Sequence, residues 1–125
     1  MAESLANHRH ILVIDDNEDF ADGLSELMEM HEHEVDVVLT GGDGVKAAQR
    51  NTYDIIFIDV RLPDMNGTDC ANQIRNSAVA AKLLLMTGYI PKDLPAQVEA
   101  MENADLLTKP IDPLSILEQI VRITP

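Results

Sequence analysis

Short, unbroken apolar runs recur along the chain, and longer segments of mixed polarity separate them. The clearest runs are Ile11–Ile14, Ile55–Ile58 and Leu83–Met86, and two weaker ones are Val35–Leu39 and Leu106–Leu107. Apolar runs without polar alternation are typical of strands that are buried on both faces. The three clear runs therefore predict the centre of a sheet that helices cover on both sides.

The segments between these runs carry apolar residues at three- and four-residue intervals, which places those residues on one helical face. The two best-defined faces consist of Phe20, Leu24, Leu27 and Met28, and of Leu114, Leu117, Ile120 and Val121. Weaker patterns predict three middle helices, the last of them over about Leu94–Glu102, and the C-terminal helix is expected over Pro113–Ile123. Strands that alternate with helices form a parallel sheet through right-handed crossovers, so we expect a doubly wound α/β domain of about five strands.

The composition of the chain limits its function. Its 125 residues suffice for one domain, and its single cysteine, Cys70, cannot form an internal disulfide. With 9 Lys and Arg against 22 Asp and Glu, the net charge of −13 argues against direct nucleic-acid binding. No apolar run approaches the roughly 20 residues of a membrane span, and the N-terminus lacks the apolar block of a signal peptide. We therefore expect a cytoplasmic protein that does not contact a membrane.

Reactive polar residues lie at the ends of four of the predicted strands. Asp15 and Asp16 follow Ile11–Ile14, Asp59 follows Ile55–Ile58, and Thr87 follows Leu83–Met86. Lys109 comes just after the last run, Leu106–Leu107, with Thr108 between them. The carboxyl ends of parallel strands lie along one edge of a sheet, where ligands bind near the topological switch point. We therefore expect the carboxylates, the hydroxyl and the ammonium group to converge.

Three converging carboxylates need a cation. Two unit charges about 4 Å apart repel by roughly 4 kcal/mol at an effective dielectric constant near 20. The candidate ligands are all oxygens, which favours a hard divalent ion, and Mg²⁺ suits a partial protein cage that leaves room for water and a phosphate oxygen. With Mg²⁺ and Lys109 added, the formal charge of the cluster is zero. Such a site favours a phosphoryl group as its ligand.

Asp59 is the best candidate nucleophile, because it ends a strongly apolar strand and precedes the turn-rich segment Val60–Gly67. A carboxylate can attack phosphorus and form an aspartyl phosphate. Phosphoryl transfer requires mainly positioning and charge neutralisation, which the metal, Lys109 and Thr87 could supply. The adjacent pair Asp15 and Asp16 suits metal binding.

At these residues the chain resembles the receiver domain of bacterial two-component response regulators. The matching segments are ILVIDDNED at Ile11–Asp19, DIIFIDVRLPDMNG at Asp54–Gly67, LLLMTG at Leu83–Gly88 and LLTKP at Leu106–Pro110. The motifs occur in the order and spacing of that family and cover nearly the whole chain. The resemblance implies a flavodoxin-like sheet of order 2-1-3-4-5, with a receiver domain over residues 9–124 after a frayed tail at residues 1–8.

The resemblance also implies a role for each residue of the site. These roles are Asp59 as phosphoacceptor, Asp15, Asp16, Asp59 and the Arg61 backbone carbonyl as Mg²⁺ ligands, Thr87 and Lys109 as contacts of the phosphoryl group, and Pro110 as the residue after a cis peptide bond. The phosphoryl donor would be a histidine kinase or a histidine phosphotransfer protein. Phosphorylation-dependent dimerisation, the output partner and the cognate kinase stay open.

The chain departs from the family pattern on its last strand. Where the family usually has an aromatic switch residue, three positions before the lysine, this chain has Leu106. We therefore expect the switch to act through Thr87 and Tyr89, with Tyr89 as the moving aromatic side chain. Arg61 and Tyr89 each lie two residues beyond a site residue, at positions that flank the path of the attacking water in the family, and are expected to slow the loss of phosphate.

Two other functions are compatible with the motifs. One is a Mg²⁺-dependent phosphatase or phosphotransferase that acts on a separate substrate and also forms an aspartyl phosphate on its own nucleophile. Such enzymes commonly carry a second carboxylate two residues past the nucleophile, where this chain has Arg61. The other is a docking module that acts without phosphorylation. We expect a regulatory phosphoacceptor that catalyses only its own phosphorylation and dephosphorylation.

Three further features have structural interpretations. The run His31–Glu34 is rich in metal-ligand types, but its two histidines are two residues apart and do not share a helix face. Cys70 is expected to pack beneath its helix. The segment Gly41–Gly44 lacks the Lys and Ser/Thr of a P-loop and is expected to be a flexible turn and helix start.

Overall fold

The computed structural model describes residues 8–77 and 80–122. Five parallel strands form one sheet in the order β2-β1-β3-β4-β5. In chain order the strands are β1 (His10–Ile14), β2 (Glu34–Val38), β3 (Ile55–Asp59), β4 (Lys82–Thr87) and β5 (Ala104–Thr108). This is the strand order that the family resemblance implies, and the doubly wound α/β fold is confirmed.

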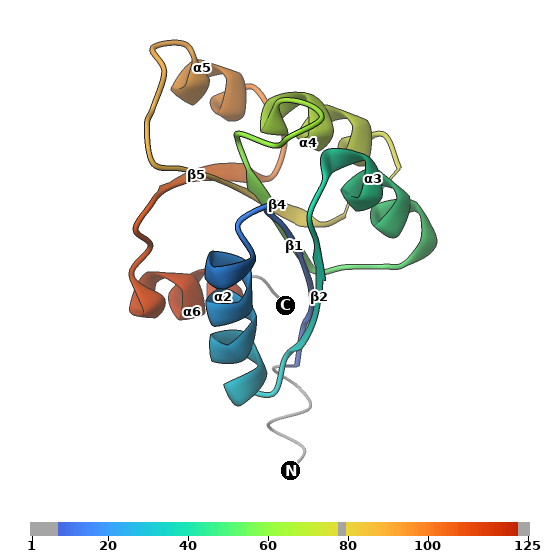
Figure 1. The fold of residues 1–125 in the computed structure, drawn as a ribbon, viewed down its shortest axis with the longest axis vertical. Helices are drawn as coiled ribbons and strands as arrows, with labels where there is room; N and C mark the ends of the chain where they lie inside the picture. The colour runs from blue at the N-terminus through green and yellow to red at the C-terminus, as the bar shows by residue number, and fades with distance from the viewer. Residues whose placement is uncertain (1–7, 78–79, 123–125) are drawn as a thin grey trace.

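Helices cover both faces of this sheet (Figure 1). They are α2 (Glu18–Met30), α3 (Gly41–Arg50), α4 (Gly67–Arg75), α5 (Leu94–Glu99) and α6 (Pro113–Arg122). Helices α2 and α6 pack on one face, whereas α3, α4 and α5 pack on the other. The loops after β1 and β5 therefore lead to helices on one face, and the loops after β2, β3 and β4 lead to helices on the other.

The core consists of two apolar layers, one on each side of the sheet. Successive strand residues point to opposite faces, so Leu12 and Ile14 belong to the layer beneath α3, α4 and α5, whereas Ile11 and Val13 belong to the layer beneath α2 and α6. All four side chains are fully buried. This double burial explains why β1, β3 and β4 are continuous apolar runs, while the edge strands β2 and β5 are only partly buried.

The Gly41–Gly44 segment forms the first turn of α3, so the expected helix start is confirmed, whereas the expected flexible turn is wrong. The side chain of Thr40 caps this helix by accepting a hydrogen bond from the Asp43 amide, 3.1 Å away. Gly44 lies against Ile14, and a Cβ atom at this position would come within 2.9 Å of Ile14 Cγ1. The glycine therefore lets α3 approach β1 closely.

Helix α5 is shorter than expected, because it ends at Glu99 and not at Glu102. The guanidinium group of Arg75 donates hydrogen bonds to the carbonyl oxygens of Glu102 and Asn103, at 2.8 and 3.2 Å. Asn103 also has a left-handed backbone with φ of 53°. The chain therefore turns into β5 before another helical turn can form. Ile123, the expected end of the last helix, lies outside the described residues.

The His31–Glu34 segment connects the end of α2 to the start of β2. His31 is the C-cap of α2, and Glu32 has a left-handed backbone with φ of 68°. The ring nitrogen Nδ1 of His33 accepts a hydrogen bond from the Arg9 amide at 3.1 Å. Of the expected tail at residues 1–8, only His8 is described, and its Nδ1 lies 2.6 Å from the Glu32 carbonyl oxygen.

Candidate functional site

Acidic, basic and hydroxyl side chains meet at the carboxyl edge of the sheet. Asp15 follows β1, Asp59 ends β3, Thr87 ends β4, and Lys109 follows β5. The Nζ atom of Lys109 lies 2.8 Å from Oδ2 of Asp15 and 2.9 Å from Oδ2 of Asp59. The lysine therefore bridges two carboxylates from the neighbouring strands β1 and β3, at the point where the order of the sheet reverses.

The carboxylates of Asp15, Asp16 and Asp59 form a compact cluster. One oxygen from each lies within 4.8 Å of the other two. Asp15 is fully buried and Asp59 nearly so, while Asp16 is exposed. The second oxygen of Asp15, Oδ1, accepts a hydrogen bond from the Asn17 amide at 3.0 Å. Two buried acids and one solvent-facing acid thus share one small volume.

Burial and charge act in opposite directions on this cluster. Burial raises the pKa of Asp15, although the hydrogen bonds from Lys109 and the Asn17 amide oppose this shift. Burial disfavours the charge of Lys109, but its hydrogen bonds to Asp15 and Asp59 outweigh that effect and raise its pKa. Lys109 therefore stays charged, and among the described residues it is the cation paired with Asp15 and Asp59.

The donor set fits a hard divalent cation. Its ligands are carboxylate oxygens, and after Lys109 is counted the ionised cluster keeps a net charge of two minus. Asp15, Asp16 and Asp59 are the residues that could hold Mg²⁺. The solvent exposure of Asp16 leaves space for water ligands on that side.

A close turn after β3 shapes the entrance to Asp59. Oδ1 of Asp59 accepts a hydrogen bond from the Arg61 amide at 2.9 Å. The Gly67 amide donates a hydrogen bond to the Val60 carbonyl oxygen at 2.7 Å. A Cβ atom on Gly67 would lie 2.6 Å from Val60 Cα, so the turn requires glycine here. The carboxylate faces an open cavity of about 370 Å³ whose lining includes Asp16, Thr87 and Lys109.

The remaining expected site residues fall into two groups. Thr87, Arg61 and Tyr89 line this cavity, but the Thr87 hydroxyl is hydrogen-bonded to the backbone of Tyr89. Leu106 lies on β5 opposite Leu85 and packs against the apolar layer beneath α3, α4 and α5. The Lys109–Pro110 peptide bond is cis, which is the isomer that the family resemblance implies.

Comparison with known proteins decides the family. A sequence profile of the response regulator receiver domain matches residues 11–121. The chain belongs to this family. Among its relatives, PilH of Pseudomonas aeruginosa is 29% identical over 112 residues, which cover 88% of this chain and 93% of PilH. ArlR of Staphylococcus saprophyticus is 28% identical over 110 residues, which cover 88% of this chain but 50% of ArlR. This receiver domain therefore spans about half the length of some relatives and nearly all of others.

Solved structures agree with the assignment. A CheY-like receiver domain protein from Methanospirillum hungatei superposes with a TM-score of 0.84 at 26% identity, with 90% of each chain covered. A response regulator from Burkholderia pseudomallei gives a TM-score of 0.82 at 27% identity, with 90% of this chain and 66% of the other covered. In the described part of this receiver domain, no helix has both the length and the apolar character needed to cross a bilayer.

Three contacts of the receiver site were not expected from the sequence. The ammonium group of Lys109 lies 4.2 Å from the ring centroid of Phe20. Asn17 caps α2 through a hydrogen bond from the Phe20 amide, 3.1 Å from its Oδ1. Asp64 accepts hydrogen bonds from the Gly41 and Gly42 amides, at 2.8 and 2.9 Å, and so ties the loop after Asp59 to α3. These pairs, apart from the Asn17 cap, join segments far apart in the chain and leave no local sequence signal.

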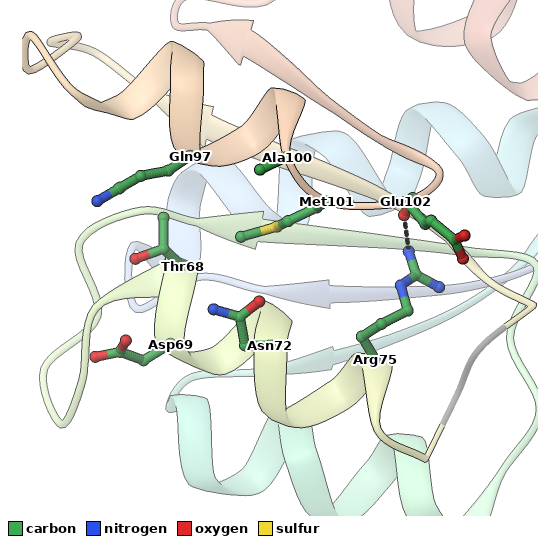
Figure 2. Close-up of a pocket in the computed structure, with 8 residues that line it drawn as sticks. All are labelled: Thr68, Asp69, Asn72, Arg75, Gln97, Ala100, Met101 and Glu102. Atoms are coloured by element: carbon green, nitrogen blue, oxygen red, sulfur yellow. Dashed lines mark hydrogen bonds between the residues drawn. The ribbon is translucent and has the colours of Figure 1, made fainter.

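A second cavity of about 490 Å³ lies between α4 and α5 (Figure 2). The three acids of the cluster are not among its lining residues. Its lining includes Asn72, Gln97 and Arg75, whose guanidinium group donates to the Glu102 carbonyl at 2.8 Å. The carboxylates at its rim, Asp69 and Glu102, are exposed. Although this cavity is larger, it lacks the buried acids that the chemistry of a receiver domain needs.

Proposed function

We propose that this receiver domain accepts a phosphoryl group on Asp59 from the phosphohistidine of a histidine kinase or a histidine phosphotransfer protein. One carboxylate oxygen of Asp59 forms a bond to phosphorus, the bond between phosphorus and the histidine nitrogen breaks, and the histidine takes up a proton. The observation that carries the proposal is the bridge from Lys109 to Asp59 within a cluster of three acids. A lone aspartate at a strand end would not support it.

Each neighbour of Asp59 has a part in this transfer. Lys109 is already in ionic contact with Asp59 and would follow the negative charge onto the phosphoryl oxygens. Thr87 would donate a hydrogen bond to the same group. Asp15 and Asp16, with Asp59 and the backbone carbonyl of Arg61, would hold Mg²⁺, which when bound neutralises charge on the phosphoryl oxygens.

A relative supports this assignment by what it contains. The Burkholderia pseudomallei regulator, 27% identical to this chain, is described with a phosphorylated aspartic acid and a calcium ion. Calcium and magnesium are both hard cations that bind carboxylate oxygens. The Asp15, Asp16 and Asp59 cluster has the ligands for the same combination, a phosphorylated aspartate beside a hard divalent cation.

The role that we propose is regulatory. The phosphoryl group resides on the protein itself, and the domain acts by presenting a changed surface to an output partner rather than by turning over a separate substrate. We further propose a cytoplasmic location, where histidine kinases present their phosphohistidine, and a surface that does not bind nucleic acid directly because of the net charge of −13.

The test is phosphorylation by a small donor, followed by intact-mass analysis. Incubation with acetyl phosphate and MgCl₂ should add one phosphoryl group to the wild-type chain and none to Asp59→Asn. The matched control is Asp105→Asn, which changes an exposed carboxylate on β5 that pairs with Lys82 outside the site. EDTA should abolish labelling of the wild type and the control. Equal labelling of wild type and Asp59→Asn, or labelling that persists in EDTA, would contradict the proposal.

A further inference from the structure

The ammonium group of Lys109 has a third neighbour besides its two carboxylates. Its Nζ atom lies 4.2 Å from the centroid of the Phe20 ring, within the range of a cation–π interaction. Phe20 is partly buried against the apolar layer beneath α2 and α6, and the Lys109 side chain is 20% exposed. This low exposure strengthens the attraction between ring and cation, because less water competes for the charge.

The ring is held in place by the same segment that carries Asp15. Asp15 Oδ1 accepts from the Asn17 amide, and Asn17 Oδ1 in turn accepts from the Phe20 amide. The Phe20 ring faces Lys109, and Lys109 donates back to Asp15 Oδ2. These four contacts form a closed circuit, so the ring position and the Asp15 position are coupled through the start of α2.

We propose that Phe20 is a positioning residue that holds Lys109 on Asp15 in the resting state and thereby lowers the affinity of the acidic cluster for a divalent cation and for a phosphoryl group. The cation–π contact and the ion pair with Asp15 are present together in this structure. The part that concerns the phosphoryl group rests on the proposed function, whereas the part that concerns the divalent cation does not.

The ammonium group of Lys109 and a divalent ion compete for the same carboxylates, and this competition lowers the affinity for the ion. A divalent ion bound by Asp15, Asp16 and Asp59 would enter the cluster where the ammonium group now lies, and two positive charges at such short range repel. Lys109 relieves that repulsion by giving up its ion pair with Asp15, whose carboxylate the divalent ion then binds. Asp15 and the Phe20 ring both hold the ammonium group from the β1–α2 segment, and under this proposal the group leaves both together. Binding of the divalent ion therefore breaks the contact between Lys109 and the Phe20 ring, which makes binding weaker.

The sharpest test changes the charge on the ring face and not its shape. Site-specific replacement of Phe20 by trifluorinated phenylalanine weakens the negative ring face, and Phe20→Leu removes the ring while keeping an apolar side chain. Affinity for MgCl₂ is measured by titration calorimetry without a phosphodonor, and affinity for beryllofluoride is measured at saturating MgCl₂. Both affinities should rise, by roughly threefold to tenfold for Phe20→Leu and by less for the fluorinated ring.

Two control variants separate positioning from a structural role. Phe20→Tyr keeps an electron-rich ring face and should bind Mg²⁺ like the wild type. Leu27→Ala removes apolar contact from the same helix about two turns further on and should lower the free energy of unfolding without raising the affinity for Mg²⁺. Loss of packing alone would weaken ion binding, so a gain in affinity identifies the cation–π contact.

The outcomes are distinct from those of the phosphorylation test. Unchanged or weaker Mg²⁺ binding by the Phe20→Leu and fluorinated variants would overturn the proposal, and so would a wild-type chain that does not bind Mg²⁺. If acetyl phosphate fails to label the wild type while the variants bind Mg²⁺ more tightly, the proposed phosphoacceptor function is wrong and the role of Phe20 towards the cation stands.

Discussion

The hydroxyl of Thr87 donates a hydrogen bond to the carbonyl oxygen of Tyr89, 2.6 Å away, and accepts one from the Tyr89 amide at 3.2 Å. A threonine hydroxyl has one proton to donate. If that proton is given to a phosphoryl group on Asp59, the bond to the Tyr89 carbonyl has to break. The loop that begins at Gly88 is therefore held in its present conformation by the same hydroxyl that would contact the phosphate.

We predict that phosphorylation is transmitted through the Tyr89 loop rather than through Leu106. Tyr89 is 65% exposed, so its side chain can move without opening the core. Leu106 is paired with Leu85 in the sheet and packs against the apolar layer, and it has no polar tip to exchange between solvent and pocket. Amide hydrogen exchange with and without beryllofluoride should change most at Thr87–Ile90, and also on the face formed by α5, β5 and α6, without a large rearrangement at Leu106.

The matching control for this experiment is Thr87→Ala. This variant cannot donate a hydrogen bond to the phosphoryl mimic, so the exchange pattern of its Tyr89 loop should not respond to beryllofluoride. A Tyr89 loop that does not respond in the wild type, combined with a large rearrangement at Leu106, would refute this route of transmission.

The lifetime of the aspartyl phosphate provides a second prediction. Arg61 and Tyr89 both line the cavity in front of Asp59, and both side chains are exposed at its mouth. A long cationic side chain and a bulky aromatic one at these positions should obstruct the water that hydrolyses the phosphate. The double variant Arg61→Ala with Tyr89→Ala should therefore lose phosphate severalfold faster in a time course of intact mass. An unchanged rate would show that these side chains do not guard the site.

The apolar runs predict the strands correctly because buried parallel strands need apolar residues on both faces, as Ile11–Ile14 shows. They also predict the convergence of Asp15, Asp59 and Lys109, because strand ends in a parallel sheet share an edge. Contacts that depend on how a helix sits on the sheet are not encoded locally. Phe20 follows the pattern of an ordinary core position on α2, and nothing near it in the chain indicates that Lys109 lies over its ring.

Element ends are harder to predict for a related reason. The apolar pattern around Leu94 continues to Met101, which favours a longer helix than the one observed. Helix α5 ends earlier because Arg75, from α4, binds the carbonyl oxygens of the following turn. Only the tertiary structure brings that guanidinium group to the end of α5.

A third prediction concerns the glycine within α2. Gly23 lies in the middle of the helix and is exposed, and a Cβ atom at this position would meet nothing within 4 Å. Gly23→Ala should therefore raise the free energy of unfolding by about 0.5–1 kcal/mol, because alanine loses less backbone entropy on forming a helix. Urea denaturation measures this change. Gly44→Ala is the contrasting variant and should be destabilising, since its Cβ would press into Ile14.

The last prediction concerns His33 and the response of stability to pH. Burial lowers the pKa of His33, and the neighbouring histidines His8 and His31 lower it further. The geometry agrees, because Nδ1 of His33 accepts the Arg9 amide proton and so has to be unprotonated. In the unfolded chain the imidazole takes up a proton near the ordinary histidine pKa of 6.5. Below pH 6.5 the unfolded state binds more protons than the folded state. The contribution of His33 to the free energy of unfolding is therefore present above this pH and is lost as the pH falls.

Urea denaturation of the wild type should therefore show a loss of stability between about pH 7.5 and about pH 5.5. His33→Asn places an amide oxygen where Nδ1 now accepts the Arg9 proton, but it does not titrate, so its stability should fall less over the same range. His31→Asn removes one of the two neighbouring histidines that lower the pKa of His33 but keeps the Arg9 hydrogen bond, so its pH profile should lie between those of the wild type and His33→Asn. Parallel profiles for the wild type and His33→Asn would show that His33 does not couple folding to pH.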